Sequence, residues 1–116
     1  MGRQAEQGPG TVVDIAQIGP SGWERVYLFA PYTPTEGIYQ ALGFRWPEVE
    51  RSSIRSNDGV NLVVFVRGGE VVGWFEHPRN RGDIAEDVAR AEGYARDEAR
   101  FVVQLDAEQR LVLAAR

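Results

Sequence analysis

Residues 60–77, VNLVVFVRGGEVVGWFEH, contain two apolar runs on either side of Gly68 and Gly69. A two-residue loop of type I′ needs positive φ at both of its positions, and glycine adopts positive φ without steric cost. The stretch therefore predicts a β-hairpin. Because the first run is apolar on both faces from Leu62 to Val66, we expect its strand in the interior of a sheet that is covered on both sides.

Folding this hairpin about its two glycines without a break gives a definite register. Opposite charges then meet beside the turn and apolar residues meet beyond it, which stabilises the pairing by about 0.2–1 kcal/mol for each cross-strand pair. Gly73 falls opposite Val64 and leaves a gap into which a helix or an aromatic ring could pack. The predicted pairs are Arg67–Glu70, Val66–Val71, Phe65–Val72, Val63–Trp74, Leu62–Phe75 and Val60–His77.

Further strands are expected before and after the hairpin. Residues 11–18 and 23–30 alternate apolar with polar side chains, and GPSG at 19–22 has the composition of a turn. RFVVQL at 100–105 and RLVLAA at 110–115 form two apolar runs around a short polar segment. These last two runs predict a terminal hairpin.

A helix of two to three turns is expected between the second strand and the central hairpin. Thr33 and Glu36 have the spacing of a capping box, with Thr33 as the N-cap and Pro34 at the first helical position. Gly43 stands where a left-handed residue would end the helix.

The segment DIAEDVARAEG at 83–93 predicts a second short helix. Asp83 is placed to cap it, and Ile84 and Val88 form an apolar stripe at i, i+4. Glu86 and Asp87 fall in the first turn, where acidic side chains stabilise the helix dipole.

The order of elements predicts an α+β domain with a single antiparallel β-sheet and two short helices packed on it. A short extra strand is expected near residues 53–55. We expect residues 1–10 to form a flexible leader and residues 11–116 to form the domain. With 43% hydrophobic residues, this chain of 116 residues can bury a core without metals or disulfides.

Composition excludes several kinds of site. The formal charge is −4, and all 13 basic residues are arginine, so the chain lacks the positive excess of a nucleic-acid-binding protein. Because there is no cysteine, thiolate nucleophiles and cysteine-ligated metals are excluded. No apolar run is long enough to span a membrane. We expect no metal, no cofactor and no catalytic motif of the phosphate-loop or nucleophile-elbow type.

The only histidine, His77, lies at the end of the predicted hairpin and is followed by Arg79 and Arg81. These three residues are candidates for a binding site, and a histidine titrating near neutral pH could also act as an acid or base. Glu76 points to the opposite face of the strand and is not its natural partner. The tripeptide Arg81-Gly82-Asp83 has a structural explanation as an entry to a helix, and nothing in it demands an exposed adhesion loop.

Aromatic residues near prolines form a second candidate binding surface. Tyr32, Phe44 and Trp46 lie in the loops around the first predicted helix, and Tyr39 lies at the edge of that helix's apolar stripe. Aromatic side chains in restrained loops often anchor partners or sugars. The alternative is that Phe44 and Trp46 cover a sheet face while Tyr32 fixes the helix entry.

Three segments of the chain carry a resemblance: GWERVYLFAPYTPTEGIYQALGFRW at 22–46, DGVNLVVFVRGGEVVGWFEHPRNRGD at 58–83 and YARDEARFVV at 94–103. They resemble a group of small, uncharacterised bacterial proteins that follow a signal peptide or a lipoprotein leader. The resemblance covers roughly residues 22–105, and its most specific pieces are VYLFAPYTP and EHPRNRGD. It implies an extracytoplasmic location, periplasmic or at the cell surface, and it assigns no catalytic residue.

These observations favour a small, non-enzymatic binding or interaction module of the bacterial cell envelope, with a protein or small-molecule ligand. Two alternatives stay open. One is a metal-independent, RNase-like hydrolase that uses His77 with the nearby arginines. The other is an inhibitor or immunity-type protein that blocks an enzyme by surface complementarity. The sequence leaves the oligomeric state open.

Overall fold

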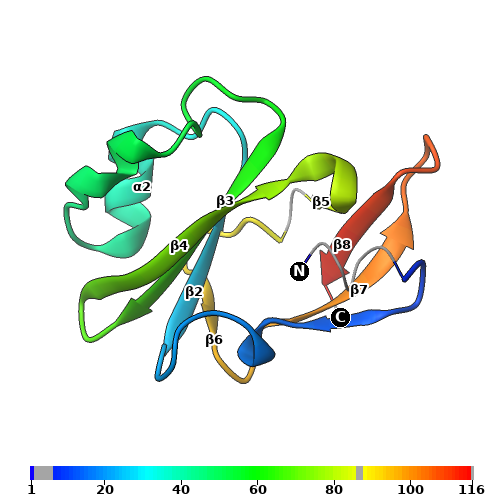
Figure 1. Cartoon of the computed structure of the whole chain (residues 1–116), viewed down its shortest axis with the longest axis horizontal. Coiled ribbons are helices and arrows are strands. Elements are labelled where there is room, and N and C mark those ends of the chain that lie inside the picture. The colour runs from blue at the N-terminus through cyan, green and yellow to red at the C-terminus, as the bar shows by residue number, and fades with distance from the viewer. Residues whose placement is uncertain (2–6, 86–87, 116) are drawn as a thin grey trace.

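The computed structural model describes residues 1, 7–85 and 88–115, and it is built mainly from strands (Figure 1). One α-helix and three short 3-10 segments complete the described part. The strands are β1 (Val12–Asp14), β2 (Arg25–Phe29), β3 (Val60–Arg67), β4 (Glu70–Pro78), β5 (Asp83–Ile84), β6 (Tyr94–Ala95), β7 (Arg100–Leu105) and β8 (Leu111–Ala115). The helix is α2 (Thr35–Leu42), and the 3-10 segments are η1 (Ile15–Gln17), η2 (Pro47–Arg51) and η3 (Arg79–Arg81).

The strands form two sheets, so the expectation of a single sheet is wrong. Sheet I has the order β4-β3-β2-β6 and is antiparallel, while sheet II has the order β1-β7-β8-β5 and ends in a parallel β5–β8 pair. A second sheet is needed because the central strands β2 and β3 are buried along nearly their whole length, so both faces of sheet I must be covered. Helix α2 covers one face of sheet I, and sheet II lies on its other side (Figure 1).

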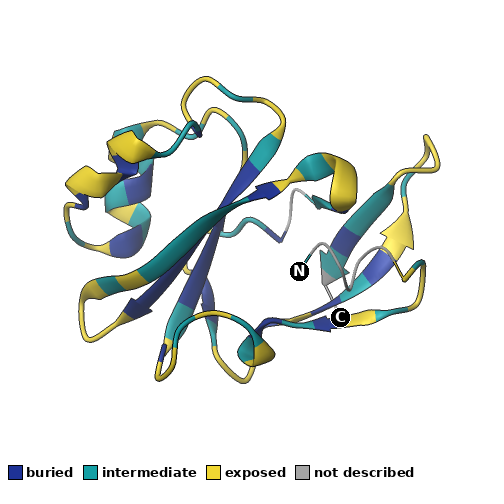
Figure 2. Cartoon of the chain, in the orientation of Figure 1, coloured by how far each residue is buried: buried dark blue, intermediate teal, exposed yellow. Residues whose placement is uncertain are grey.

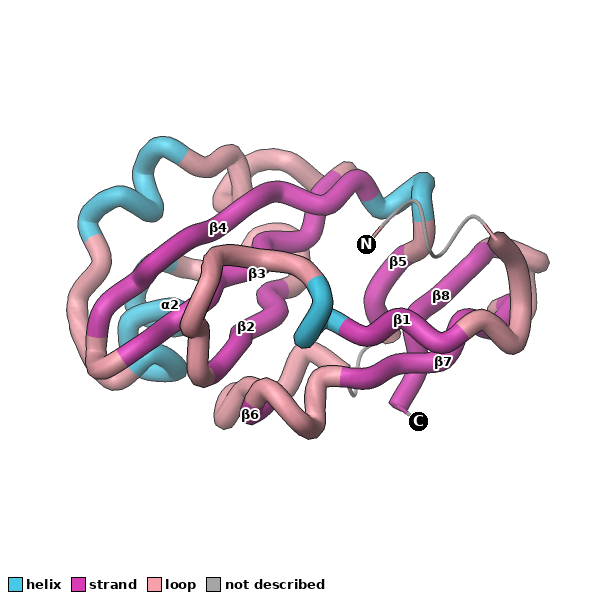
Figure 3. The backbone as a smooth tube through the Cα atoms, turned by 60° about the horizontal axis from the view of Figure 1, so that its bottom comes forward, coloured by secondary structure: helices cyan, strands magenta, loops and turns pink. Residues whose placement is uncertain are grey.

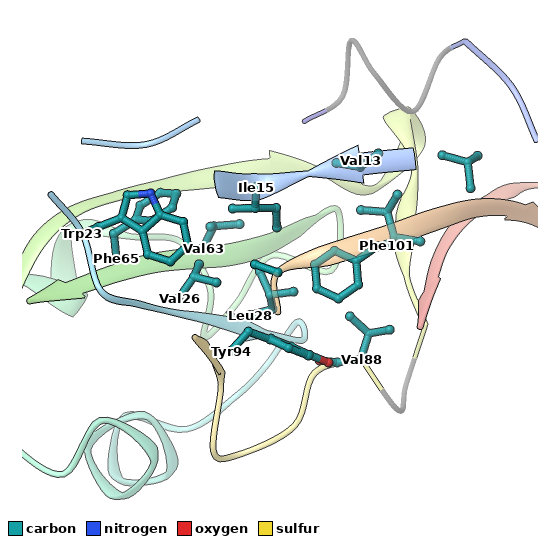
Figure 4. Close-up of a cluster of buried hydrophobic side chains, with 13 residues drawn as sticks. Val13, Ile15, Trp23, Val26, Leu28, Val63, Phe65, Val88, Tyr94 and Phe101 are labelled. Atoms are coloured by element: carbon teal, nitrogen blue, oxygen red, sulfur yellow. The ribbon is translucent and has the colours of Figure 1, made fainter. Parts of the chain in front are cut away.

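Two apolar clusters correspond to these two faces. Figure 2 shows the buried residues concentrated on the central strands of sheet I, with exposed residues at the turns and on the outer side of the helix. The cluster between the sheets includes Val26, Leu28, Val63 and Phe65 from sheet I and Phe101 from sheet II (Figure 4). The other cluster, on the α2 side, includes Ile38, Leu42, Trp46, Leu62 and Val64. The prediction that Leu62 to Val66 is covered on both sides is therefore confirmed.

The first helix is confirmed, but its capping box is not. Pro34 is the N-cap, and the Thr33 hydroxyl donates backward to the Ala30 carbonyl at 2.6 Å instead of accepting from the helix. At the other end, Gly43 has a φ of 84° and donates its amide to the Tyr39 carbonyl, as the sequence predicts. Residues 53–55 form a turn in place of the short extra strand.

The second predicted helix is absent from the described residues of segment 83–93. Asp83 and Ile84 form strand β5 against β8, and residues 88–93 are turns. Ile84 and Val88 join the cluster between the sheets, so tertiary packing overrides the weak helical pattern. Glu86 and Asp87, expected in the first turn of that helix, lie outside the described residues.

The predicted turn of the central hairpin is confirmed, but the predicted register is wrong beyond the first two pairs. Gly68 and Gly69 have φ values of 57° and 78°, as a type I′ turn requires. A β-bulge follows, because Val66 pairs with Val71 while Phe65 pairs with Gly73. The extra residue is Val72, which is exposed.

The bulge moves every later pair by one residue. The predicted gap at Gly73 exists, but it lies opposite Phe65 and is covered by Pro20, which would stand 3.0 Å from a Cβ at Gly73. At the far end of the hairpin, Asn61 rather than Val60 now lies opposite His77.

The ends of the domain follow the prediction more closely. Strands β7 and β8 form the expected terminal hairpin. Of the strand expected at residues 11–18, only β1 (Val12–Asp14) is formed, paired with β7, and the 3-10 segment Ile15–Gln17 follows it. Of the predicted leader, residues 2–6 lie outside the described residues, while the Gly10 amide donates to the Val103 carbonyl at 2.8 Å. Within the described part of the chain, no helix is long and apolar enough to cross a membrane.

Candidate functional site

Two buried polar side chains face each other at the end of the β3–β4 pair. Asn61 and His77 are each only 2% exposed, whereas the neighbouring core positions are apolar. Burying a polar side chain among apolar ones is unfavourable unless it forms hydrogen bonds. The hydrogen-bond partners of Asn61 and His77 therefore define the structure at this end of the sheet.

The imidazole of His77 is bound to the backbone and to no described carboxylate. Its Nε2 atom lies 2.7 Å from the Gly82 carbonyl oxygen, and since a carbonyl only accepts, Nε2 carries the proton. Burial lowers the pKa of His77 and the bond to Gly82 raises it. The positive charges of the amino terminus and Arg81 lower it further and the carboxylate of Asp83 raises it, with a net lowering. The side chain of Glu76 lies on the other face, where it accepts from the amide and hydroxyl of Ser53, as expected.

Asp83 is the centre of a hydrogen-bond network beside this histidine. Its carboxylate accepts from Arg79 Nε at 3.0 Å and from Arg79 Nη2 at 2.7 Å, a bidentate pair. It also accepts from Asn61 Nδ2 at 3.2 Å and from the Ile84 amide at 2.8 Å. Burial raises the pKa of Asp83, but the bonds from Arg79, Asn61 and Ile84 outweigh it and hold the pKa below its usual range.

This network explains the Arg81-Gly82-Asp83 tripeptide. Gly82 is buried, with a φ of 115°, and Asp83 is committed to Arg79 and Asn61 rather than presented to solvent. The structural interpretation of the tripeptide therefore holds, although Asp83 begins a strand and does not cap a helix. The short 3-10 segment Arg79–Arg81 makes the turn between β4 and β5.

A pocket of about 570 Å³ lies between this turn and the β7–β8 hairpin. We call it the arginine pocket; its lining includes Pro78, Arg79, Asp83, Asp106, Arg110 and Leu111. Its volume falls in the range of about 300–1,000 Å³ that is typical of small-molecule sites.

The two arginines of the pocket keep part of their hydrogen-bonding capacity. Arg79 donates three of its five N–H groups to described residues, two to Asp83 and one to the Asp58 carbonyl. Arg110 contacts the carboxylates of Asp106 and Glu108, and its side chain is 68% exposed. Two guanidinium groups with remaining donors can together bind a carboxylate or a phosphate.

The acids of the pocket are already occupied by hydrogen bonds. Asp83 is saturated by the network described above, and Asp106 accepts from the amides of Glu108 and Arg110, both at 2.9 Å. Neither carboxylate is placed as a free general base. Among the described residues, no group of three or more histidine, aspartate or glutamate side chains could hold a metal ion.

The structure divides the candidate residues of the sequence into two groups. His77, Arg79 and Arg81 come together at the end of β4, and Tyr32, which is 56% exposed, is close enough to Arg79 to contribute to its raised pKa, after the larger effect of Asp83. The second group lies on the α2 side. There Trp46 is buried and Tyr39 and Phe44 are partly buried against the same cluster.

Phe44 and Trp46 therefore cover a face of sheet I, as the alternative interpretation of the sequence expects, and only Tyr32 of these aromatic residues is largely exposed. Sequence reasoning also missed Asn61, Asp83, Asp106 and Arg110 as parts of a site. The sequence did mark Asn61, because it is the one polar residue in the run from Val60 to Val66. No feature of the sequence marked Asp106 and Arg110, since only the fold brings them to β4.

The buried histidine predicts a specific pH dependence of stability. Because folding lowers the pKa of His77, its contribution is fully present above about pH 6.5, the unfolded value, and is lost as the pH falls toward the folded value. We expect the free energy of unfolding to fall between pH 7 and pH 5 by at most about 1.4 kcal/mol for each pH unit. Urea unfolding at several pH values measures it.

The control is the His77→Gln variant, which removes the titrating group and keeps an amide donor. Asp83 adds little to this slope, since with a lowered pKa its contribution is lost only as the pH falls below about 5. We expect the free energy of unfolding to decline less between pH 7 and pH 5 in the His77→Gln variant than in the original chain. Equal slopes in the two proteins would contradict the assignment to His77.

Comparisons of the chain with protein-family models, with curated proteins and with solved structures find no match.

Proposed function

We propose that this protein is a small binding module that holds the carboxylate or phosphate group of a ligand in the arginine pocket, without catalysing a reaction. The observation that carries the proposal is the pair Arg79 and Arg110 on one concave surface, each with donors to spare. Pro78 and Leu111 supply apolar contact beside the two charged groups.

The arrangement of acids and histidine supports binding over hydrolysis. A general acid–base mechanism needs a titrating group within reach of the substrate, but the ring of His77 is buried and bound to the Gly82 carbonyl. Asp83 is held by Arg79, whose hydrogen bonds favour the charged carboxylate, and Asp106 is engaged by the amides of Glu108 and Arg110. These contacts therefore support a binding function over the RNase-like alternative.

The proposal is tested by titrating the ¹⁵N-labelled chain with succinate, citrate and inorganic phosphate. We expect chemical-shift changes at Gly59 and Asn80, which also line the pocket, and at Leu111. In the Arg110→Ala variant, affinity for the best of these probes should fall at least about tenfold, since a charge-assisted hydrogen bond contributes about 1.5–3 kcal/mol.

Arg100→Ala is the matched control, because Arg100 is an exposed arginine of the neighbouring strand that does not line the pocket. It should bind the probes like the original chain. An equal loss in both variants would show general attraction by positive charge, and an absence of shifts at the pocket with all three probes would disprove the proposal.

We also propose an extracytoplasmic location, which rests on the resemblance to envelope proteins alone. The test is fractionation of cells that express the native gene, followed by detection of the protein in the envelope, periplasmic and cytoplasmic fractions. Recovery in the cytoplasmic fraction only would contradict this location and would leave the pocket proposal unaffected.

A further inference from the structure

A second pocket lies along β4, away from the His77 end of that strand. Its volume is about 360 Å³, and it is lined by Trp46, Glu48 and the four consecutive β4 residues Val71 to Trp74. We call it the tryptophan pocket. It includes the bulge residue Val72, whose side chain is 38% exposed.

β4 is an edge strand. The order of sheet I places β3 on one side of it and no described strand on the other, and Figure 3 shows β4 along the outer margin of the sheet. An edge strand presents unpaired backbone amide and carbonyl groups, so an extended peptide can add to it as a further strand.

The side chains of the tryptophan pocket suit a cation. The rings of Trp46 and Trp74 are 5.8 Å apart at 75°, and Trp46 is held in the apolar cluster, so the pair has a fixed geometry. Glu48 accepts a long hydrogen bond of 3.4 Å from Trp74 Nε1, and no described arginine pairs with its carboxylate. A lysine or arginine side chain can contact a tryptophan ring and a carboxylate at the same time.

We infer that β4 is a docking edge for an extended basic peptide, which adds as a strand beside Val71 to Trp74 and places a lysine or arginine against Trp74 and Glu48. Four of the six lining residues are consecutive strand residues, which favours a peptide over a free small cation. The chain's net charge of −4 also favours a basic partner.

A second copy of this chain is a poorer occupant. β4 carries Glu70 and Glu76 and contains no arginine or lysine, so pairing two β4 strands would supply no cation for Glu48. The inference is independent of the arginine pocket, which lies at the opposite end of β4 and binds the opposite charge.

The test uses ¹⁵N-labelled chain and three capped seven-residue peptides of alternating threonine and valine, with lysine, glutamate or norleucine at the centre. We expect the lysine peptide to shift the amides of Val71 to Trp74 and the indole N–H of Trp74. We also expect it to bind about tenfold more tightly than the glutamate peptide. The affinity of the norleucine peptide, whose central side chain is apolar and of similar length, should lie between those of the other two peptides.

The Glu48→Gln variant should bind the lysine and glutamate peptides within about twofold of each other, with the norleucine peptide unchanged. The matched control is Glu50→Gln, because Glu50 is an exposed acid of the same 3-10 segment that does not line this pocket. It should keep the tenfold preference. Both acids are on the surface, so neither variant is expected to change the unfolding temperature.

Three results would overturn the inference. The first is that no β4 amide shifts with the lysine peptide at millimolar concentration. The second is an equal loss of preference in Glu48→Gln and Glu50→Gln, which would show general charge attraction. The third is that β4 amides shift with protein concentration alone and sedimentation shows a dimer, which would identify a second copy as the occupant.

Discussion

Replacing Phe65 by alanine is expected to lower the free energy of unfolding by about 3–5 kcal/mol, the usual cost of removing a buried phenylalanine side chain. Phe65 is 1% exposed in the cluster between the sheets, with ring centroids 5.2 Å from Trp23 and 6.0 Å from Phe75. A domain of this size has a total stability of about 5–15 kcal/mol, so the variant loses a large share of it. Urea unfolding followed by tryptophan fluorescence measures the change.

Val72→Ala on the opposite strand is the control for this prediction. In a hairpin without a bulge, Val72 would pair with Phe65, whereas the bulge leaves it 38% exposed and unpaired. We expect Val72→Ala to change the free energy of unfolding by no more than about 0.5 kcal/mol. A loss comparable to that of Phe65→Ala would mean that the bulge is misplaced.

Gly93→Ala is expected to destabilise the protein by about 2–5 kcal/mol, through backbone strain and a close contact together. Gly93 has a φ of 66°, a left-handed conformation that costs a residue with a Cβ about 1–2 kcal/mol. A Cβ at this position would lie 2.6 Å from the Val26 carbonyl oxygen and 2.8 Å from the ring of Tyr27. Since the carbonyl belongs to a central strand, it cannot move away without disturbing the β2–β6 pair.

The Gly43→Ala variant separates the effect of backbone strain from the effect of the close contact. Gly43 has a φ of 84° after α2, and a Cβ there would meet no atom within 4 Å. It should therefore cost only about 1–2 kcal/mol, the strain of the left-handed backbone. Urea unfolding of both variants gives the difference, and equal losses would contradict the close approach of Gly93 to Val26.

Part of the candidate site could be foreseen from the sequence. His77, Arg79 and Arg81 stand close together in the chain, and of these three Arg79 lines the arginine pocket while His77 is buried beside it. The partners that give them their properties are distant. Asn61 reaches this place only because the bulge at Val72 changes the register of the hairpin by one residue. Arg110 reaches it only because the terminal hairpin belongs to sheet II.

For the aromatic residues, the sequence left two interpretations open. Tyr32, Phe44 and Trp46 share a composition and a neighbourhood in sequence, which grouped them as one surface. In the fold, Phe44 and Trp46 pack into the cluster on the α2 side of sheet I, as the alternative interpretation expects, while Tyr32 stays exposed. Composition reports the chemical type of a side chain, but the direction it faces depends on the elements that flank it.

The sequence by itself determined the features that depend on neighbours along the chain. These are the glycine turn of the central hairpin, the two-sided apolar strand β3, the helix that ends at Gly43, and the terminal hairpin. Tertiary structure alone decided the number of sheets, the bulge, the strand at Asp83–Ile84 where a helix was expected to begin, and both pockets. The reason is that each of these depends on contacts between distant segments, such as Ile84 against β8, whose free energy exceeds a weak local preference.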